Sequence, residues 1–164
     1  MNIFFLSLNP YLCAIYHCDR HVVKMILEYA QILCTVHHLC NSNPNPKLYK
    51  PAFKNHPDTI WARTTTGNYC WLYLLFRHLC KEYTYRYNKI HITETKLLDI
   101  LNVIPDKIPI GNITTLPQCM FEDVKHKNEK IAYHKFYNKY KRPFCTWLKR
   151  EKPYFFKNIN ENNE

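Results

Sequence analysis

The sequence predicts a mostly α-helical protein that folds as a single compact domain, with a short extended N-terminal arm and long ordered loops. Apolar residues recur at helical spacing over most of the chain. Stretches rich in proline and asparagine interrupt this pattern, as expected for loops between helices. The 164 residues show no internal repeat and no domain-splitting linker. We therefore expect one domain over 1–157 and a polar, disordered tail over 158–164.

The N-terminal part combines the arm with the first helix. Residues 3–8 form an apolar run, which is either a strand or a buried extended arm. Asn9 as N-cap and Pro10 at the first helical position then predict the start of a helix. Apolar positions at helical spacing continue as far as His37 and His38, so one uninterrupted helix is expected over this stretch.

Loops and shorter helices fill the remainder of the chain. Residues 41–46 predict a loop, and 49–58 predict a structured loop that presents Asn55 and His56. The other expected elements are a second helix over about 58–87 with a break near 66–67, a third from Thr93 as N-cap to before Pro105, a connection over 105–120, a fourth helix over 127–141 and a helical turn over 144–150.

Composition narrows the classes of function. Twenty-three Lys and Arg against 13 Asp and Glu give a net charge of +10. This charge favours a polyanionic partner, with nucleic acid as the first candidate. The alternative is that the basic residues serve only solubility or reflect an AT-rich genome. Two glycines in the whole chain exclude a P-loop and a Rossmann motif. Eight cysteines without a C-x-x-C pair indicate reduced thiols in an intracellular protein, with Cys18 as a weak nucleophile candidate. No run has the length of a signal peptide or a membrane span, so no membrane partner is expected.

Four ionisable residues recur along the predicted first helix. His17, His21, Lys24 and Glu28 stand at i, i+4, i+7 and i+11, which places them on one face. A solvated surface face could carry such groups, but two imidazoles beside an amine and a carboxylate favour a site where neighbouring groups shift one another's pKa values. The stripe is the candidate catalytic centre.

Rings and cations alternate in the C-terminal third. Residues 122–157 hold 11 Lys or Arg against four acids, interleaved with aromatic side chains. Cations can follow phosphates while aromatic rings stack on unpaired bases. The alternative is a core helix with solvated lysines on its outer side. By spacing, Phe136 and Tyr140 are expected to be buried, and Tyr137 and Lys141 to point outward.

The Asn55-His56-Pro57 element is a further candidate. Pro57 biases His56 toward extended geometry, so its imidazole can face a cleft. His17, His21 and His56 could form a metal triad, because histidines at i and i+4 are a known ligand spacing. No glutamate follows the first histidine in the metalloprotease manner, and acid–base work or phosphate binding is preferred. No metal or other cofactor is expected.

Two family resemblances arise from these residues. The segment Tyr16–Met25, Asn55-His56-Pro57, Trp61-Ala62, Glu82–Tyr87 and Pro117–Met120 resemble an uncharacterised family encoded by tailed phages and giant viruses, over most of the chain. More faintly, the start Ser7–Leu12, Asp19-Arg20, Asn55-His56-Pro57 and the aromatic basic C-terminus are similar to pyrimidine-dimer DNA glycosylases of the endonuclease V type. Those are small, basic, all-α enzymes that flip a nucleotide.

The second resemblance implies a mechanism. It implies attack by an N-terminal amine on a sugar carbon, Schiff-base formation and strand cleavage, with a carboxylate of the first helix assisting. Where such enzymes have Arg-Glu-x-x-Arg, this chain has Arg20-His21-Val22-Val23-Lys24, so a histidine stands at the carboxylate position. Asp19 or Glu28 would then supply the carboxylate, unless the activity has been lost or replaced. Asn2 is bulky enough that Met1 is retained and offers the terminal amine.

These arguments predict a viral DNA-processing enzyme, similar to a pyrimidine-dimer DNA glycosylase and AP lyase or to a nuclease, which acts on a flipped or unpaired nucleotide inside the host cytoplasm or nucleus. The alternative is a non-catalytic protein that binds nucleic acid or a signalling nucleotide, for example in viral counter-defence. The predicted catalytic residues are His21, His17, Glu28, Asp19, His56 and Met1. The predicted residues for binding nucleic acid or phosphate are Arg20, Lys24, Asn55, Arg63, Arg86, Tyr137, Lys141 and Arg142.

Overall fold

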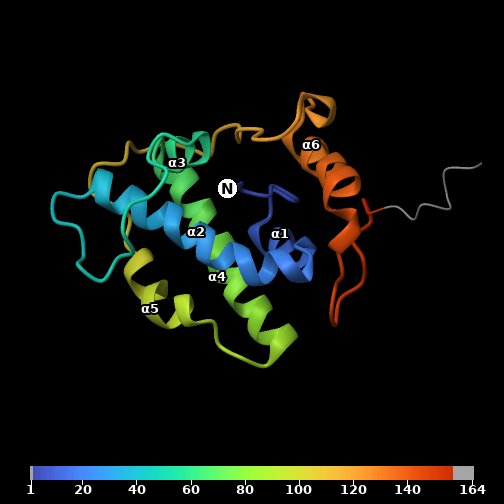
Figure 1. Cartoon of the computed structure of the whole chain (residues 1–164). Coiled ribbons are helices and arrows are strands. Elements are labelled where there is room, and N and C mark those ends of the chain that lie inside the picture. Colours follow the sequence, from blue (N-terminus) through green and yellow to red (C-terminus); the bar gives the residue numbers. More distant parts are fainter. Residues whose placement is uncertain (1, 157–164) are drawn as a thin grey trace, which may run out of the picture.

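The structure, a computed structural model, describes residues 2–156, and the predicted tail over 158–164 lies outside them. The helices are α1 (Pro10–Tyr16), α2 (Asp19–Cys40), α3 (Pro57–Ala62), α4 (Thr66–Tyr87), α5 (Ile92–Leu101) and α6 (Glu129–Phe136) (Figure 1). Short 3-10 turns cover Glu122–Val124 and Arg142–Phe144, and a π-helical turn over Tyr137–Lys141 continues α6. Residues 2–156 contain no strand, so the mostly α-helical class is confirmed.

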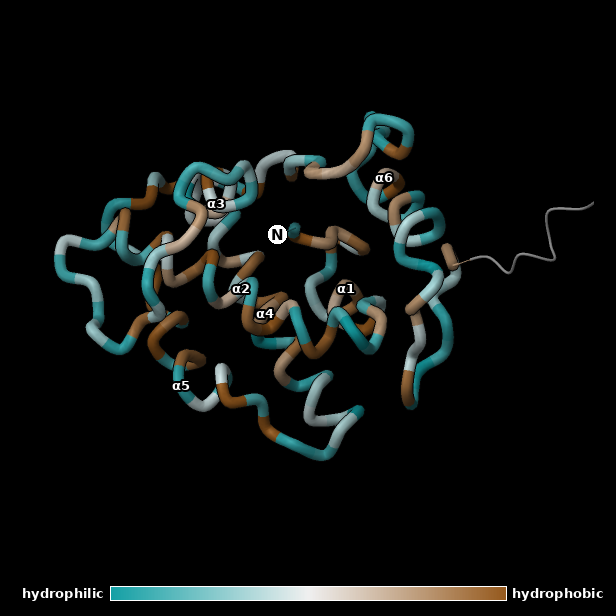
Figure 2. The backbone as a smooth tube through the Cα atoms, in the orientation of Figure 1, coloured by the Kyte–Doolittle hydropathy of each residue, from teal (hydrophilic) through white to brown (hydrophobic). Residues whose placement is uncertain are grey.

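The two long helices organise the fold. Helices α2 and α4 cross near the middle of the molecule, and the other helices lie around them (Figure 1). Their apolar stretches meet at the crossing, whereas the loop from α2 to α3 is largely hydrophilic (Figure 2). Fully buried side chains such as Ile26, Leu33, Leu72 and Phe76 form the centre of one core to which all six helices contribute. No described helix combines the length and the apolar composition that crossing a membrane requires.

The N-terminal run is a buried extended arm and not a strand. Ile3 and Leu6 are fully buried, and the arm lies near the centre of the molecule, close to α1 (Figure 1). Ile3 N donates to the carboxylate of Asp58 at 2.9 Å, and Phe4 N donates to the hydroxyl of Tyr29 at 3.0 Å. These two bonds satisfy backbone N–H groups of the arm, which has no neighbouring strand to accept from them. The arm therefore has a fixed position relative to α2 and α3.

The expected single helix over residues 10–38 is wrong, because it breaks after Tyr16. It begins as predicted, with the Asn9 side chain accepting from the backbone N–H groups of Tyr11 and Leu12. His17 then adopts an extended conformation, with φ −60° and ψ 131°. The buried guanidinium of Arg86 donates to the carbonyls of Ile15 and His17, at 2.9 and 3.0 Å. Carbonyl groups at the end of a helix have no acceptor role within the helix, and the Arg86 guanidinium donates to these two.

Other boundaries differ for local reasons. The helix expected over 58–87 stops at Ala62 and restarts at Thr66, where the Thr65 hydroxyl caps α4. Gly67 lies inside α4 and does not break it; a Cβ there would come within 2.5 Å of Ile113 N. His91, not Thr93, is the N-cap of α5. The helical turn expected over 144–150 is absent, since the 3-10 turn ends at Phe144 and no described helix follows.

Candidate active site

A pocket of about 170 Å³ opens beside the N-terminal half of α2. It brings together the N-terminal arm, α2 and the π-helical turn, three segments far apart in the sequence. Its lining residues are Asn2, Phe4, His21, Lys24, Met25, Glu28 and Lys141. Three of the four residues of the predicted stripe therefore share one pocket, which we call the α2 pocket.

Helix α2 supplies the ionisable side of the α2 pocket. His21, Lys24 and Glu28 stand at i, i+3 and i+7, one face of a continuous helix. The ammonium of Lys24 lies 3.1 Å from the Glu28 carboxylate. The Lys24 side chain is 65% exposed and that of Glu28 only 17%, so the carboxylate lies deeper than the amine. This pair places a negative charge inside the pocket and a positive charge at its mouth.

His21 is held by rings on several sides. Its imidazole stacks on Phe4 with centroids 4.2 Å apart and an interplanar angle of 16°. Its Nδ1 lies 2.6 Å from the hydroxyl of Tyr137, and Phe144 approaches edge-on. A buried, hydrogen-bonded ring has a fixed orientation, which is a requirement for transferring a proton at a defined atom.

Lys141 closes the opposite wall of the α2 pocket. It is the last residue of the π-helical turn and is half-buried. Its ammonium lies 4.7 Å from the ring centroid of Phe136 and 5.9 Å from that of Phe4. Burial lowers the pKa of Lys141, and the positive charge of Lys24 lowers it further.

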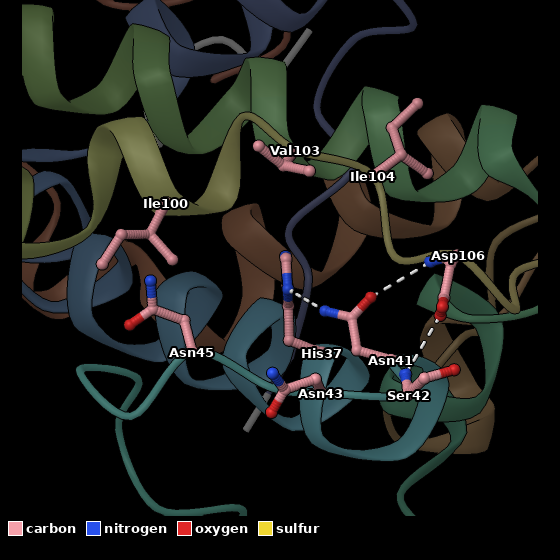
Figure 3. Close-up of a pocket in the computed structure, with 9 residues that line it drawn as sticks. All are labelled: His37, Asn41, Ser42, Asn43, Asn45, Ile100, Val103, Ile104 and Asp106. Carbon is pink, nitrogen blue, oxygen red and sulfur yellow. Dashed lines mark hydrogen bonds between the residues drawn. The ribbon is translucent and has the colours of Figure 1, made fainter.

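A larger pocket of about 410 Å³ lies at the other end of α2 (Figure 3). Its polar groups bond to one another: His37 Nδ1 lies 2.8 Å from the Asn41 amide, and Asp106 bonds to both Asn41 and Ser42. Burial lowers the pKa of His37 to about 4, so this imidazole is neutral at pH 7. The lining includes no Lys or Arg, and we therefore place the candidate site in the smaller α2 pocket.

His17 does not take part in the α2 pocket, which corrects its predicted catalytic role. The ring is fully buried, with Nδ1 2.7 Å from the Cys13 carbonyl and Nε2 2.9 Å from the Tyr29 hydroxyl. Burial lowers the pKa of His17 to about 3. Its ring lies 6.5 Å from that of His21 but does not line the pocket.

Asp19 and Arg86 belong to a closed ionic cluster that also contains Glu82 and Arg150. Asp19 accepts from Arg86 at 2.9 Å, from the Thr146 hydroxyl and from the backbone N–H of Leu148. Arg86 is 1% exposed and also donates to Glu82, which in turn accepts from Arg150. The predicted roles of Asp19 in catalysis and Arg86 in phosphate binding do not fit these positions, since both side chains hold the fold together.

His56 and Asn55 lie outside the α2 pocket. His56 caps α3, its Nδ1 accepting from the backbone N–H of Asp58, and Asn55 is exposed. The predicted triad of His17, His21 and His56 is not among the groups of described residues that could hold a metal. His56, Asp58 and Cys119 could, with ligand atoms within 4.8 Å of one another. Burial raises the pKa of Asp58 to about 7, so a metal would compete there with a proton.

The remaining predicted binding residues are dispersed. Arg20 is exposed and lies over the Phe144 ring, with its guanidinium carbon 5.0 Å from the centroid. Arg63 donates to the Lys54 carbonyl, and Arg142 donates to Asn138 and lies over Phe156. Met1 lies outside the described residues, so its predicted role as nucleophile stays a prediction.

The prediction that Tyr137 points outward is wrong. Tyr137 is fully buried, one α-helical turn after the equally buried Tyr133, to whose carbonyl its backbone N–H donates. Its hydroxyl contacts His21 instead of solvent.

Cys18 lies directly behind this arrangement. It is fully buried at the N-cap of α2, and its interaction with the Cys145 thiol lowers the pKa of Cys18. It does not line the α2 pocket, and so its geometry does not favour the weak nucleophile candidacy.

Sequence reasoning missed Asn2, Phe4 and Met25 as parts of the pocket. Asn2 is buried, donates from its side chain to the Cys119 carbonyl and accepts from the Tyr133 hydroxyl. No sequence signal marks these contacts, because they join residues 117 and 131 positions apart. Met25 follows Lys24 on the pocket face of α2 and could have been found from helical spacing.

The fold and the pocket define a basic, all-α protein with an imidazole, two amines and a carboxylate around one opening. The chain belongs to the pyrimidine dimer DNA glycosylase family, whose family model matches residues 1–95. The matched part contains every residue of the α2 pocket except Lys141. No curated protein and no solved structure matches the chain.

Proposed function

We propose that this protein is a DNA glycosylase that acts on pyrimidine dimers at the α2 pocket. The observation that supports it most is the position of His21, Lys24 and Glu28 in one pocket within the part of the chain that matches the family. The net charge of +10 suits a DNA partner. The resemblance of residues 16–25 to phage and giant-virus proteins supports a role in repairing viral DNA.

Size sets what can enter the α2 pocket. Its volume of about 170 Å³ is below the roughly 300–1,000 Å³ of sites that enclose a drug-sized ligand. We infer that a sugar and part of a flipped nucleotide enter while the rest of the damaged site stays outside. Flipping is easiest for a damaged base, which contributes to selectivity.

The pocket residues can then share the chemistry. Breaking the bond between base and sugar builds positive charge on the sugar, and the recessed carboxylate of Glu28 can stabilise that charge. This gives Glu28 the role that the family resemblance assigns to a carboxylate, seven residues after His21 on the same face. His21 can carry a proton, and Lys24 and Arg20 can bind the flanking phosphates.

The test uses duplex DNA with a single cyclobutane thymine dimer. It measures cleavage of the glycosidic bond, read as free thymine after photoreversal of the dimer, and strand cleavage. We expect the wild-type protein to act on this duplex, and Glu28→Gln to slow it by roughly 100-fold or more. The matched control is Glu151→Gln, at an exposed glutamate, which should act like wild type. If wild-type protein binds the duplex but cleaves neither the glycosidic bond nor the strand, the enzyme proposal is wrong and a non-catalytic binder is the better description.

A further inference from the structure

Lys141 differs from every other cation around the α2 pocket. Its amine faces the aromatic rings of Phe4 and Phe136, and no described residue forms an ion pair or a hydrogen bond with it. Lys24, by contrast, is paired with Glu28 and is mostly exposed. A structural lysine in a half-buried place normally has a carboxylate partner, whereas this amine contacts only the faces of two rings among the described residues, so its position needs a different explanation.

The surrounding segment holds the amine in place. The π-helical turn is tied down at two points before Lys141: Tyr137 contacts His21, and Lys139 forms an ion pair with Asp123. Phe136 and Phe4 are both buried and form the wall behind the amine. π-helical turns inserted in helices are often found at functional sites.

The environment suits a nucleophilic amine. An amine attacks carbon only in its neutral form, and lysines become neutral more readily when they are desolvated or lie beside another cation. Lys141 meets both conditions, since burial and Lys24 both lower its pKa. A lysine that merely binds phosphate would be better placed in solvent, as Lys24 is.

We propose that the Nζ atom of Lys141 forms a Schiff base with C1′ of the deoxyribose at an abasic site. The inference rests on the proposed function, because an abasic site is what base release produces. The inference assigns the attacking amine to a residue outside the part of the chain that the family model matches. Lys141 acts either together with the terminal amine or in its place.

The step balances without any other reactant. The neutral amine attacks the C1′ aldehyde of the opened sugar, a C–N bond forms, and the carbonyl oxygen takes up a proton. Loss of water then gives a protonated imine. Removal of a C2′ proton by a base, a role within reach of Glu28 or His21 in this pocket, breaks the C3′–O bond and releases the 3′ strand with its phosphate. Water finally hydrolyses the imine and frees the amine.

The test is borohydride trapping of the full chain on duplex DNA that carries a ready-made abasic site, followed by peptide mapping of the adduct by mass spectrometry. We expect the adduct on Lys141, and we expect Lys141→Arg to lose it while the circular dichroism spectrum and the melting temperature stay as in wild type. Lys135→Arg, at an exposed lysine of α6, is the matched control and should trap normally. Lys141→Gln provides a second variant if Lys141→Arg is poorly folded.

An adduct that maps to the terminal amine alone, or wild-type trapping by a folded Lys141→Arg, would overturn the inference. Either result leaves the proposed function standing if the wild-type protein still cleaves the glycosidic bond in dimer-containing DNA. Conversely, an adduct on Lys141 without any action on dimers supports the inference and shows that pyrimidine dimers are not the substrate. The two proposals therefore fail separately.

Discussion

The closed ionic cluster and the α2 pocket start from the same first turns of α2 and end in opposite arrangements. The cluster matches two carboxylates, Asp19 and Glu82, with two guanidiniums, and its central Arg86 is buried. The pocket sets the single carboxylate of Glu28 against two amines, and one of those amines has no described partner. Balanced, buried charge fixes the fold, whereas unbalanced charge at an opening is suited to an anionic ligand.

Removing the centre of the closed ionic cluster should have the largest effect. Arg86→Ala leaves the buried Glu82 with only Arg150, and it removes the donors to Ile15 and His17 at the end of α1. Breaking a buried ion pair by removing one partner costs about 3–5 kcal/mol. We expect the free energy of unfolding in urea to fall by that amount.

Arg77→Ala is the matched control for that experiment, because Arg77 is exposed on the same helix. Its unfolding midpoint should stay close to wild type. Equal losses for the two variants would mean that the cluster is no more structural than a surface charge, and the contrast between the two regions would fail.

Acid sensitivity distinguishes His17 from a site histidine. The unfolded chain binds a proton on His17 near pH 6.5, whereas burial lowers the pKa of His17 to about 3 in the folded protein. The stability contribution of neutral His17 is therefore complete above pH 6.5 and is lost as the pH falls toward 3. Between pH 7 and about 4.5 this amounts to a loss on the order of 2–3 kcal/mol.

The variant His17→Gln should remove that part of the pH dependence, because glutamine cannot titrate and can still reach the Tyr29 hydroxyl. Urea unfolding at pH 7 and at pH 4.5 gives the two stabilities whose difference is compared with wild type. If the free energy of unfolding falls equally for the variant and the wild type between pH 7 and pH 4.5, then His17 is accessible to protons in the folded state, contrary to its burial.

The smallest effect is expected at the mouth of the α2 pocket. Lys24 is 65% exposed, so Lys24→Ala should leave stability nearly unchanged. As a phosphate contact it should weaken DNA binding uniformly across sequences and reduce the salt slope of the binding constant by about one. Fluorescence anisotropy at several salt concentrations measures both quantities.

Lys96→Ala, at an exposed lysine of α5, is the comparison for Lys24→Ala. It should change neither the affinity nor the salt slope. If the two variants lower the slope equally, binding is spread over the surface and the pocket has no special share in it.

Short-range rules predicted much of the fold. Asn9 and Pro10 start α1 as expected, and His21, Lys24 and Glu28 share a face because helical spacing alone places them there. The break after Tyr16 could not be predicted, since the Arg86 guanidinium that donates to the carbonyls at this helix end lies 69 residues beyond His17. Tyr137 was placed on the wrong side because the buried face was assigned from Phe136 and Tyr140, whereas Tyr133 and Tyr137, also four residues apart, are the fully buried pair.

The π-helical turn also bears on how the site would respond to a change in residue number. Its bonds span one residue more than those of an α-helix, so Lys141 points close to where the third residue after Tyr137 would point in a regular α-helix. A chain that lost one residue between Tyr137 and Lys141 would form a regular helix there and would still carry the amine toward the same face. Relatives could therefore lack the π-helical turn and keep the lysine at the pocket, one position nearer to the tyrosine in the sequence.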